Sequence, residues 1–146
     1  MTEQMARSLA AVLDGQPERA MPGSRRWGVL STCANGRFVA IEDGAGWAYR
    51  DQKAYLASQM EGDHVGLLDS QEWDEWGEGE EWARKLSHLL GSEEYWHSGG
   101  GIWLVFYRRP DRRFAVIGSE SGGIYASYEE FDADLVGEKA ENHHFV

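Results

Sequence analysis

Two segments of this 146-residue chain show the same order of apolar runs and turns, 76 positions apart. Aligned without a gap, residues 27–57 and 103–133 share eight identities in 31 positions, whereas ordinary composition would give roughly two. The identical pairs are Trp27/Trp103, Val29/Val105, Arg37/Arg113, Phe38/Phe114, Ile41/Ile117, Gly46/Gly122, Tyr49/Tyr125 and Ala57/Ala133. The match predicts an internal duplication. It constrains the fold because a short unit with one apolar face buries that face most simply against its copy.

Each copy is expected to contain a helix, three strands and a second helix. In the first copy, residues 2–14 have apolar side chains at helical spacing, and residues 16–26 are expected to form a loop. Strands are expected at 27–33, 37–42 and 47–50, the first two joined through Asn35-Gly36, a strong hairpin signal. Asp51 is a suitable N-cap for the second helix.

The second copy follows the same order. A helix is expected at 80–90, and strands are expected at 102–108, 113–118 and 124–126. Ser127 and Glu130 have the spacing of a capping box at the start of a last helix. The sequence therefore predicts an α+β fold of two α-β-β-β-α units with pseudo-twofold symmetry. Their strands form either one antiparallel sheet or two packed three-stranded sheets, with helices on one face.

The expected organisation is a single domain over residues 1–146. Repeat one covers about 2–60, an acidic connection covers 61–78, repeat two covers about 79–136, and an acidic tail covers 137–146. A connection of that length in a compact domain is either functional or mobile.

The formal net charge of -11 is concentrated in two segments. Residues 61–81 contain nine Asp or Glu and no Lys or Arg, and residues 129–146 have a net charge of -5, while the rest of the chain sums to +3. An acidic chain argues against direct nucleic-acid binding, which needs basic surfaces. The charge belongs to the connection and the tail, not to the repeated units.

Composition limits the class of protein further. The single cysteine, Cys33, excludes an intramolecular disulfide, and no apolar run reaches the 18 residues of a membrane span. The first 15 residues do not resemble a signal peptide. We therefore expect a cytoplasmic protein that is a monomer or a homodimer and does not bind membranes.

No residue pattern predicts catalysis, a metal or a cofactor. Cys33 has no neighbouring histidine, Gly118–Gly122 lacks the central serine of a nucleophile elbow, and Gly99–Gly101 is not followed by a phosphate-loop lysine. The five histidines lack a recognised metal-ligand spacing. Asp63-His64 and the spacing of Glu94 and His97 are common by chance.

Two charged clusters are candidate contact sites. The first combines acids with tryptophans, which either anchor the segment to the domain or contact a basic partner; its residues are Glu72, Trp73, Asp74, Glu75, Trp76, Glu78, Glu80 and Glu81. The second is a candidate anion contact at one hairpin tip; its residues are Arg108, Arg109, Arg112 and Arg113. Their other interpretation is pairing with the protein's own acids or protection of a sheet edge.

Three functions are consistent with these features. The first is a non-enzymatic inhibitor, immunity or anti-defence protein whose acidic segment binds a basic surface, such as that of a nuclease or a nucleic-acid-binding protein. The second is an acidic chaperone or adaptor that receives a client segment at a sheet edge. The third is a small-ligand-binding domain with a pocket between the repeats, near Trp96, His97 and residues 108–113.

Overall fold

The computed structural model describes residues 1–19, 26–62, 65–77, 79–92, 94–97, 102–134 and 137–145. Within these ranges the chain forms four helices and two antiparallel five-stranded sheets, so the fold is α+β. The helices are α1 (Glu3–Leu13), α2 (Gln52–Glu61), α3 (Gly79–Leu90) and α4 (Tyr128–Ala133).

Each sheet is built from consecutive strands, and every neighbouring pair is antiparallel. Sheet A has the order β1 (Gln16–Arg19), β2 (Trp27–Thr32), β3 (Phe38–Ile41), β4 (Ala45–Tyr49) and β5 (Leu67–Glu72). Sheet B has the order β6 (Tyr95–His97), β7 (Trp103–Arg108), β8 (Phe114–Ile117), β9 (Ser121–Tyr125) and β10 (Glu141–His144).

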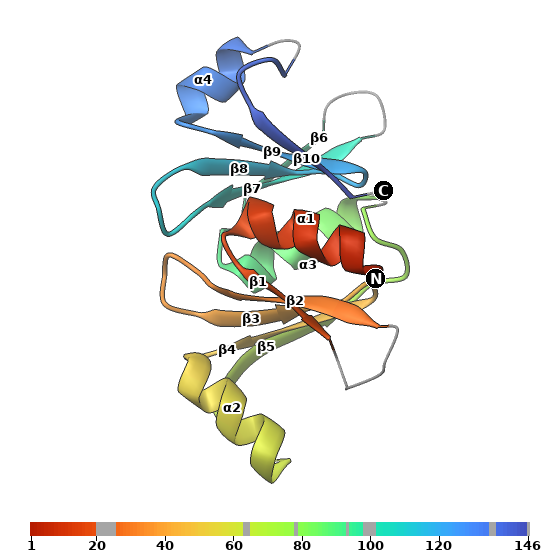
Figure 1. The fold of residues 1–146 in the computed structure, drawn as a ribbon, viewed down its shortest axis with the longest axis vertical. Helices are drawn as coiled ribbons and strands as arrows, with labels where there is room; N and C mark the ends of the chain where they lie inside the picture. Colours follow the sequence, from red (N-terminus) through yellow and green to blue (C-terminus); the bar gives the residue numbers. More distant parts are fainter. Residues whose placement is uncertain are drawn as a thin grey trace.

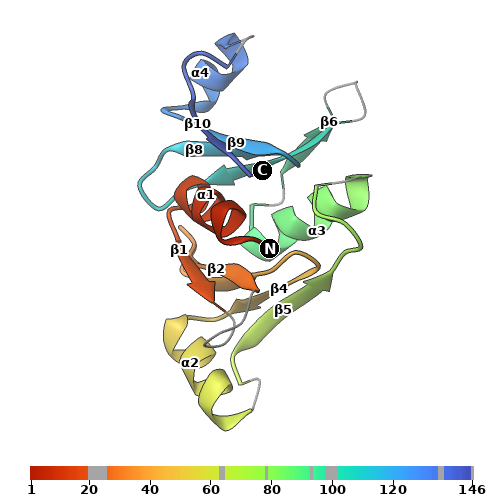
Figure 2. The same cartoon turned by 45° about the vertical axis from the view of Figure 1, so that its right-hand side comes forward.

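The elements are stacked in layers (Figure 1). Helices α1 and α3 lie side by side between the two sheets, while α2 lies beyond sheet A and α4 lies beyond sheet B. The turned view separates α1 from α3 and shows that both helices face both sheets (Figure 2). Each sheet therefore has an inner face against α1 and α3. The outer face of sheet A lies against α2, and that of sheet B lies against α4.

The main core lies between the sheets because α1 and α3 are amphipathic. Both helices place Leu and Ala on one buried side, and Leu9, Leu13, Leu86 and Leu89 are at most 1% exposed. The inner faces of the strands complete this core with residues such as Val39.

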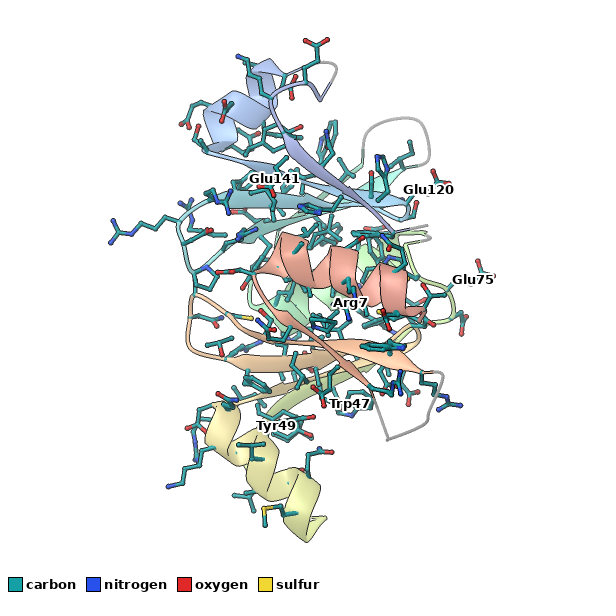
Figure 3. The ribbon with its side chains drawn as sticks, viewed as in Figure 1. Arg7, Trp47, Tyr49, Glu75, Glu120 and Glu141 are labelled. Carbon is teal, nitrogen blue, oxygen red and sulfur yellow. The ribbon has the colours of Figure 1, made fainter. Side chains whose placement is uncertain are left out.

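The outer faces form two smaller clusters, because side chains alternate between the faces along a strand. On sheet A, Phe38 and Tyr49 pack with Ala54 of α2. On sheet B, Phe106 and Phe114 pack with neighbouring apolar residues that include Phe131 of α4. Figure 3 shows Trp47 and Tyr49 on the side of sheet A that faces α2.

The order of helices and central strands agrees with the prediction, with shifts of a few residues at their ends. Four strands were not predicted, namely β1, β5, β6 and β10, and they make each sheet five-stranded rather than three-stranded. Two of them lie in the predicted acidic connection and tail, and β1 lies in a predicted loop. The expected covering of one face only is not confirmed, because α2 and α4 lie on the opposite face from α1 and α3.

Among the described residues, no helix has the length and apolar character needed to cross a bilayer.

Candidate functional site

The acidic segment runs from the end of β5 into the first turn of α3, and its tryptophans turn inward. Trp73 is only 6% exposed, and its indole N–H donates to the carbonyl oxygen of Asp43. The Trp73 backbone N–H donates to the carbonyl of Gly44 at 3.0 Å. These two hydrogen bonds attach the segment to the turn between β3 and β4.

Trp76 joins this attachment to the main core. Its ring lies 6.0 Å from that of Trp73, 5.3 Å from that of Trp82 and 6.4 Å from that of Phe145. Trp82 belongs to α3 and is 1% exposed. Of the two roles predicted for these tryptophans, the structure shows anchoring: Trp73 is buried, half-buried Trp76 packs against the core, and together they fix the loop that carries the acids.

The carboxylates of the same segment point outward. Glu72, Asp74, Glu75, Glu80 and Glu81 are all exposed. Glu81 forms an ion pair with Lys85 at 2.8 Å, and the hydrogen bond from Lys85 lowers the pKa of this carboxyl group. The Lys85 ammonium also donates to the carbonyl oxygen of Glu72 at 2.5 Å. Lysine 85 therefore holds the end of β5 to the start of α3.

A shallow depression of about 330 Å³ opens between these acids, and its walls come from the loop and from α3. It is lined by Trp73, Asp74, Glu75, Glu81 and Trp82. Its indole walls are buried and its rim is acidic, so the groups that it offers to a partner are hydrogen-bond acceptors and negative charge.

Two neighbouring turns add more acids at the same end of the molecule. The turn between β3 and β4 contributes Glu42 and Asp43, and the Met1 ammonium pairs with the Asp43 carboxylate at 2.5 Å. The turn between β8 and β9 contributes Glu120, which lies on the same side of the molecule as Glu75 (Figure 3). This turn touches the loop between β5 and α3, which we call the acidic loop, because a Cβ on Gly77 would collide with Ser119.

We call this surface the acidic end; it consists of Glu42, Asp43, Glu72, Asp74, Glu75, Glu80, Glu81 and Glu120. Glu42, Asp43 and Glu120 were missed in the sequence because they lie in short turns outside the two acidic segments. A signal was available, since the turns at 42–44 and 118–120 are 76 positions apart and correspond in the alignment of the two segments. Glu78 was predicted to belong to this site, and it lies outside the described residues, as do Asp63, His64 and Gly99–Gly101.

The arginine cluster is not one surface, because Arg109 is buried. Its side chain is 4% exposed, and Nη1 donates to the carbonyl oxygens of Ala11 at 2.9 Å and Val12 at 3.3 Å. Nε and Nη2 donate to the Asp111 carboxylate at 3.2 and 2.9 Å. Arg109 therefore caps the C-terminal end of α1, where free carbonyls and the helix dipole favour a cation.

Arg113 is neutralised by two carboxylates. It contacts Asp111 at 3.0 Å and Glu141 of β10 at 3.2 Å. Although partial burial opposes the effect, hydrogen bonds from Arg113 and Arg109 lower the pKa of Asp111. Hydrogen bonds from His143 and Arg113 lower the pKa of Glu141, against the smaller effect of burial.

Of the four arginines in this cluster, Arg108 and Arg112 are exposed and form no ion pair with another described residue. Only these two of the four predicted anion contacts present an unneutralised guanidinium to the surface. For Arg109 and Arg113, the interpretation as pairing with the protein's own acids describes what the structure shows.

Two observations on the described residues concern metal binding and thiol chemistry. Across the described ranges, no three His, Cys, Asp or Glu side chains converge closely enough to hold a metal ion. Cys33 is 3% exposed, and burial raises the pKa of its thiol, which disfavours the reactive thiolate.

In comparisons with known proteins, no family model, no curated protein and no solved structure matches the chain.

Proposed function

We propose that this chain is a small, non-enzymatic binding protein whose acidic end engages a basic surface of another protein. The inhibitor or immunity class is the one that best combines these properties. Its partner is a protein that itself binds nucleic acid, such as a nuclease, because such proteins carry the basic surface that this acidic end would complement.

The observation that carries the proposal is the support beneath the carboxylates. Acidic runs are commonly solvated and mobile, but this one is attached through Trp73 to Asp43 and through Trp76 to Trp82. Charges held on a fixed loop lose little conformational entropy when a partner binds, and this lowers the cost of association. The acidic end thus has the form of a preorganised surface.

The distribution of charge supports a steering role. Nine of the chain's acids lie within residues 61–81, a stretch without Lys or Arg, and Lys85 and the Met1 ammonium neutralise single carboxylates of the acidic end. The field of such a patch speeds encounter with a basic partner and falls steeply with ionic strength.

We further propose that the two halves arose by duplication. Strands β2, β3 and β4 have the same lengths as β7, β8 and β9, and their bounds differ by 76 residues throughout. Helices α1 and α3, and α2 and α4, begin 76 residues apart as well. In this view the acidic loop is an addition at the junction between copies, which leaves it available for a specialised role.

The proposal is tested by affinity capture from the native host with three immobilised baits. The first is the wild-type chain, and the second carries Glu72→Gln, Asp74→Asn and Glu80→Gln. The third is a matched control that removes the same number of exposed charges from α4 and the tail, through Glu129→Gln, Asp132→Asn and Glu138→Gln.

We expect a basic protein that the wild type and the control retain at about 50 mM salt and that the acidic-end variant loses. The same protein should leave the wild type at about 500 mM salt. Retention that is equal on all three baits, or that does not change with salt, would contradict the proposal. Circular dichroism of each bait confirms that the loss does not come from unfolding.

A further inference from the structure

A groove on the outer face of sheet B is separate from the acidic end. It has a volume of about 550 Å³ and lies between β6, β7, β8 and α4. The residues that line it are Glu94, Tyr95, Trp96, Phe106, Arg108, Phe114 and Tyr128. No residue of the acidic end contributes to its walls.

Aromatic side chains are exposed around this groove. Trp96 is 48% exposed and Tyr128 is 50% exposed, and the rings of Phe106 and Phe114 form the floor between them. Helix α4 has only six residues and leaves this part of the face open, whereas α2 has ten. Exposed aromatic side chains around a groove mark surfaces that become buried in complexes.

Two opposite charges lie in the same groove without neutralising each other. Glu94 and Arg108 both line it and are exposed, and neither side chain forms an ion pair or hydrogen bond within the described ranges. A foreign partner of one charge sign would leave one of these two groups unpaired. A surface that carries both signs is complementary to itself, provided that a twofold axis runs between the two groups.

Sheet B also ends at this groove. Strand β6 is the terminal strand of the sheet and pairs with β7 alone among the described strands. Trp96 therefore stands on an edge strand that has no second strand partner among the described residues, and such an edge is a template for pairing with another chain.

We propose that this groove is the contact surface of a homodimer. A twofold axis between Glu94 and Arg108 places Glu94 of each copy opposite Arg108 of the other, and it brings the aromatic walls of the two grooves together. The dimer uses a surface distinct from the acidic end, so each protomer keeps that end available for its own partner.

Sedimentation equilibrium of the wild-type chain and of two charge reversals, Glu94→Arg and Arg108→Glu, tests this arrangement. We expect the wild type to dimerise below about 100 µM, and each single variant to dimerise at least about tenfold more weakly, because like charges then face each other. An equimolar mixture of the two variants should recover dimers, since each mixed pair has opposite charges at both contacts.

Arg112→Glu is the matched control, because Arg112 is exposed and unpaired in the described structure but does not line the groove. It should dimerise as the wild type does. A second variant, Trp96→Ser, removes the exposed indole without changing charge and should also weaken the dimer.

Three results would each overturn the proposal: a wild-type chain that remains monomeric at about 100 µM, single reversals that dimerise normally, or a mixture that recovers nothing. Urea unfolding of every variant shows whether it is folded, and all the substituted side chains are exposed, so the native state should persist.

Discussion

The two hairpin tips have the same backbone and different side chains. In the first tip, the backbone N–H of Cys33 donates to the carbonyl of Arg37 at 2.7 Å; in the second, that of Arg109 donates to the carbonyl of Arg113 at 2.9 Å. A side-chain oxygen at the middle of each tip, from Asn35 or Asp111, accepts the next hydrogen bond. These shared hydrogen bonds define the same turn in both tips, while the other side chains of the tips differ.

Each tip contributes an arginine to a helix of the other half. Arg37 in the first half donates to the carbonyls of His88 and Leu89 at 3.0 and 3.2 Å, at the end of α3. Arg109 in the second half caps α1 in the same manner. Arg37 corresponds by alignment to Arg113, and Arg109 corresponds to Cys33, so equivalent contacts come from different positions.

The two capping arginines differ in how far they are buried. Arg109 is almost fully enclosed and is held by Asp111 as well, whereas Arg37 is partly exposed. A buried guanidinium whose partners are carbonyls and a carboxylate is costly to disturb, and a partly solvated one is not. The halves thus depend on each other through two unequal contacts.

The largest effect is expected when these caps are removed. Arg109→Met should lower the free energy of unfolding by about 3 kcal/mol, because it leaves helix carbonyls and Asp111 without their buried cation. Arg37→Met should cost only about 1 kcal/mol, the usual value of a partly solvated hydrogen bond. Urea unfolding of both variants measures the difference, and equal losses would contradict the unequal burial of the two caps.

A second comparison concerns two glycines at corresponding positions. Gly46 of β4 faces Leu89 of α3, and Gly122 of β9 faces Val12 of α1, so each strand approaches a helix of the other half. A Cβ at position 122 would lie 2.7 Å from Val12 Cγ2, and one at position 46 would collide with the end of the Leu89 side chain.

Replacing either glycine with valine should destabilise the protein by about 2 kcal/mol, because the added methyl groups overpack the contact between sheet and helix. Gly122→Val should cost more, since the β-branched Val12 adjusts less easily than Leu89. Gly44→Ala is the control, because its nearest neighbour would be 3.4 Å away. Thermal unfolding compares the three variants; an equal shift for Gly44→Ala would show that overpacking is not the cause.

The central part of the fold was predictable because its signals are local. The strands β2, β3, β7 and β8 carry apolar residues between clear turn signals, and the N-caps Asp51 and Ser127 accept hydrogen bonds from Ala54 and Glu130 as expected. The strands that were missed lie at sheet edges. Gln16–Arg19 contains a proline and Glu141–His144 is polar, so their pairing depends on neighbours that a local pattern does not reveal.

The candidate site was predictable as a charge pattern but not as a surface. The outward direction of the acids follows from their chemistry. Whether Trp73 turns inward depends on the Asp43 carbonyl, 30 residues away, and the burial of Arg109 depends on α1, almost 100 residues away. Such tertiary contacts override local composition, so the sequence identified the segments and left their orientation undecided.

A smaller effect is expected from the residues that bend the two tips. Gly36 has a φ of 92° and Arg112 has a φ of 71°, a left-handed conformation that glycine adopts more easily than arginine. Gly36→Ala should therefore destabilise by about 1 kcal/mol, while Arg112→Gly should stabilise by about 0.5 kcal/mol. Chemical unfolding at pH 7 measures both, and changes of the same sign would mean that backbone strain does not distinguish the tips.

The smallest expected effect is a difference between the tips in how they make stability depend on pH. The first tip places a thiol where the second places Arg109, and burial raises the pKa of Cys33 and of the adjacent Tyr107. In the unfolded chain the thiol loses its proton near pH 8.5, before the folded chain does, so stability is complete below that pH and falls as pH rises toward the folded pKa.

For Cys33→Ala, the urea midpoint should stay within a few tenths of a molar of its pH 7 value up to about pH 9.5. The wild-type midpoint should decline over the same interval. Above about pH 10 both proteins should lose stability through Tyr107, which remains in the variant. Urea unfolding of both proteins at half-unit pH steps tests this prediction. Below pH 7 the two proteins should show the same pH dependence, which serves as the reference. Identical alkaline profiles would show that the thiol at this tip is already accessible to hydroxide in the folded state, and the two tips would then differ only in their arginines.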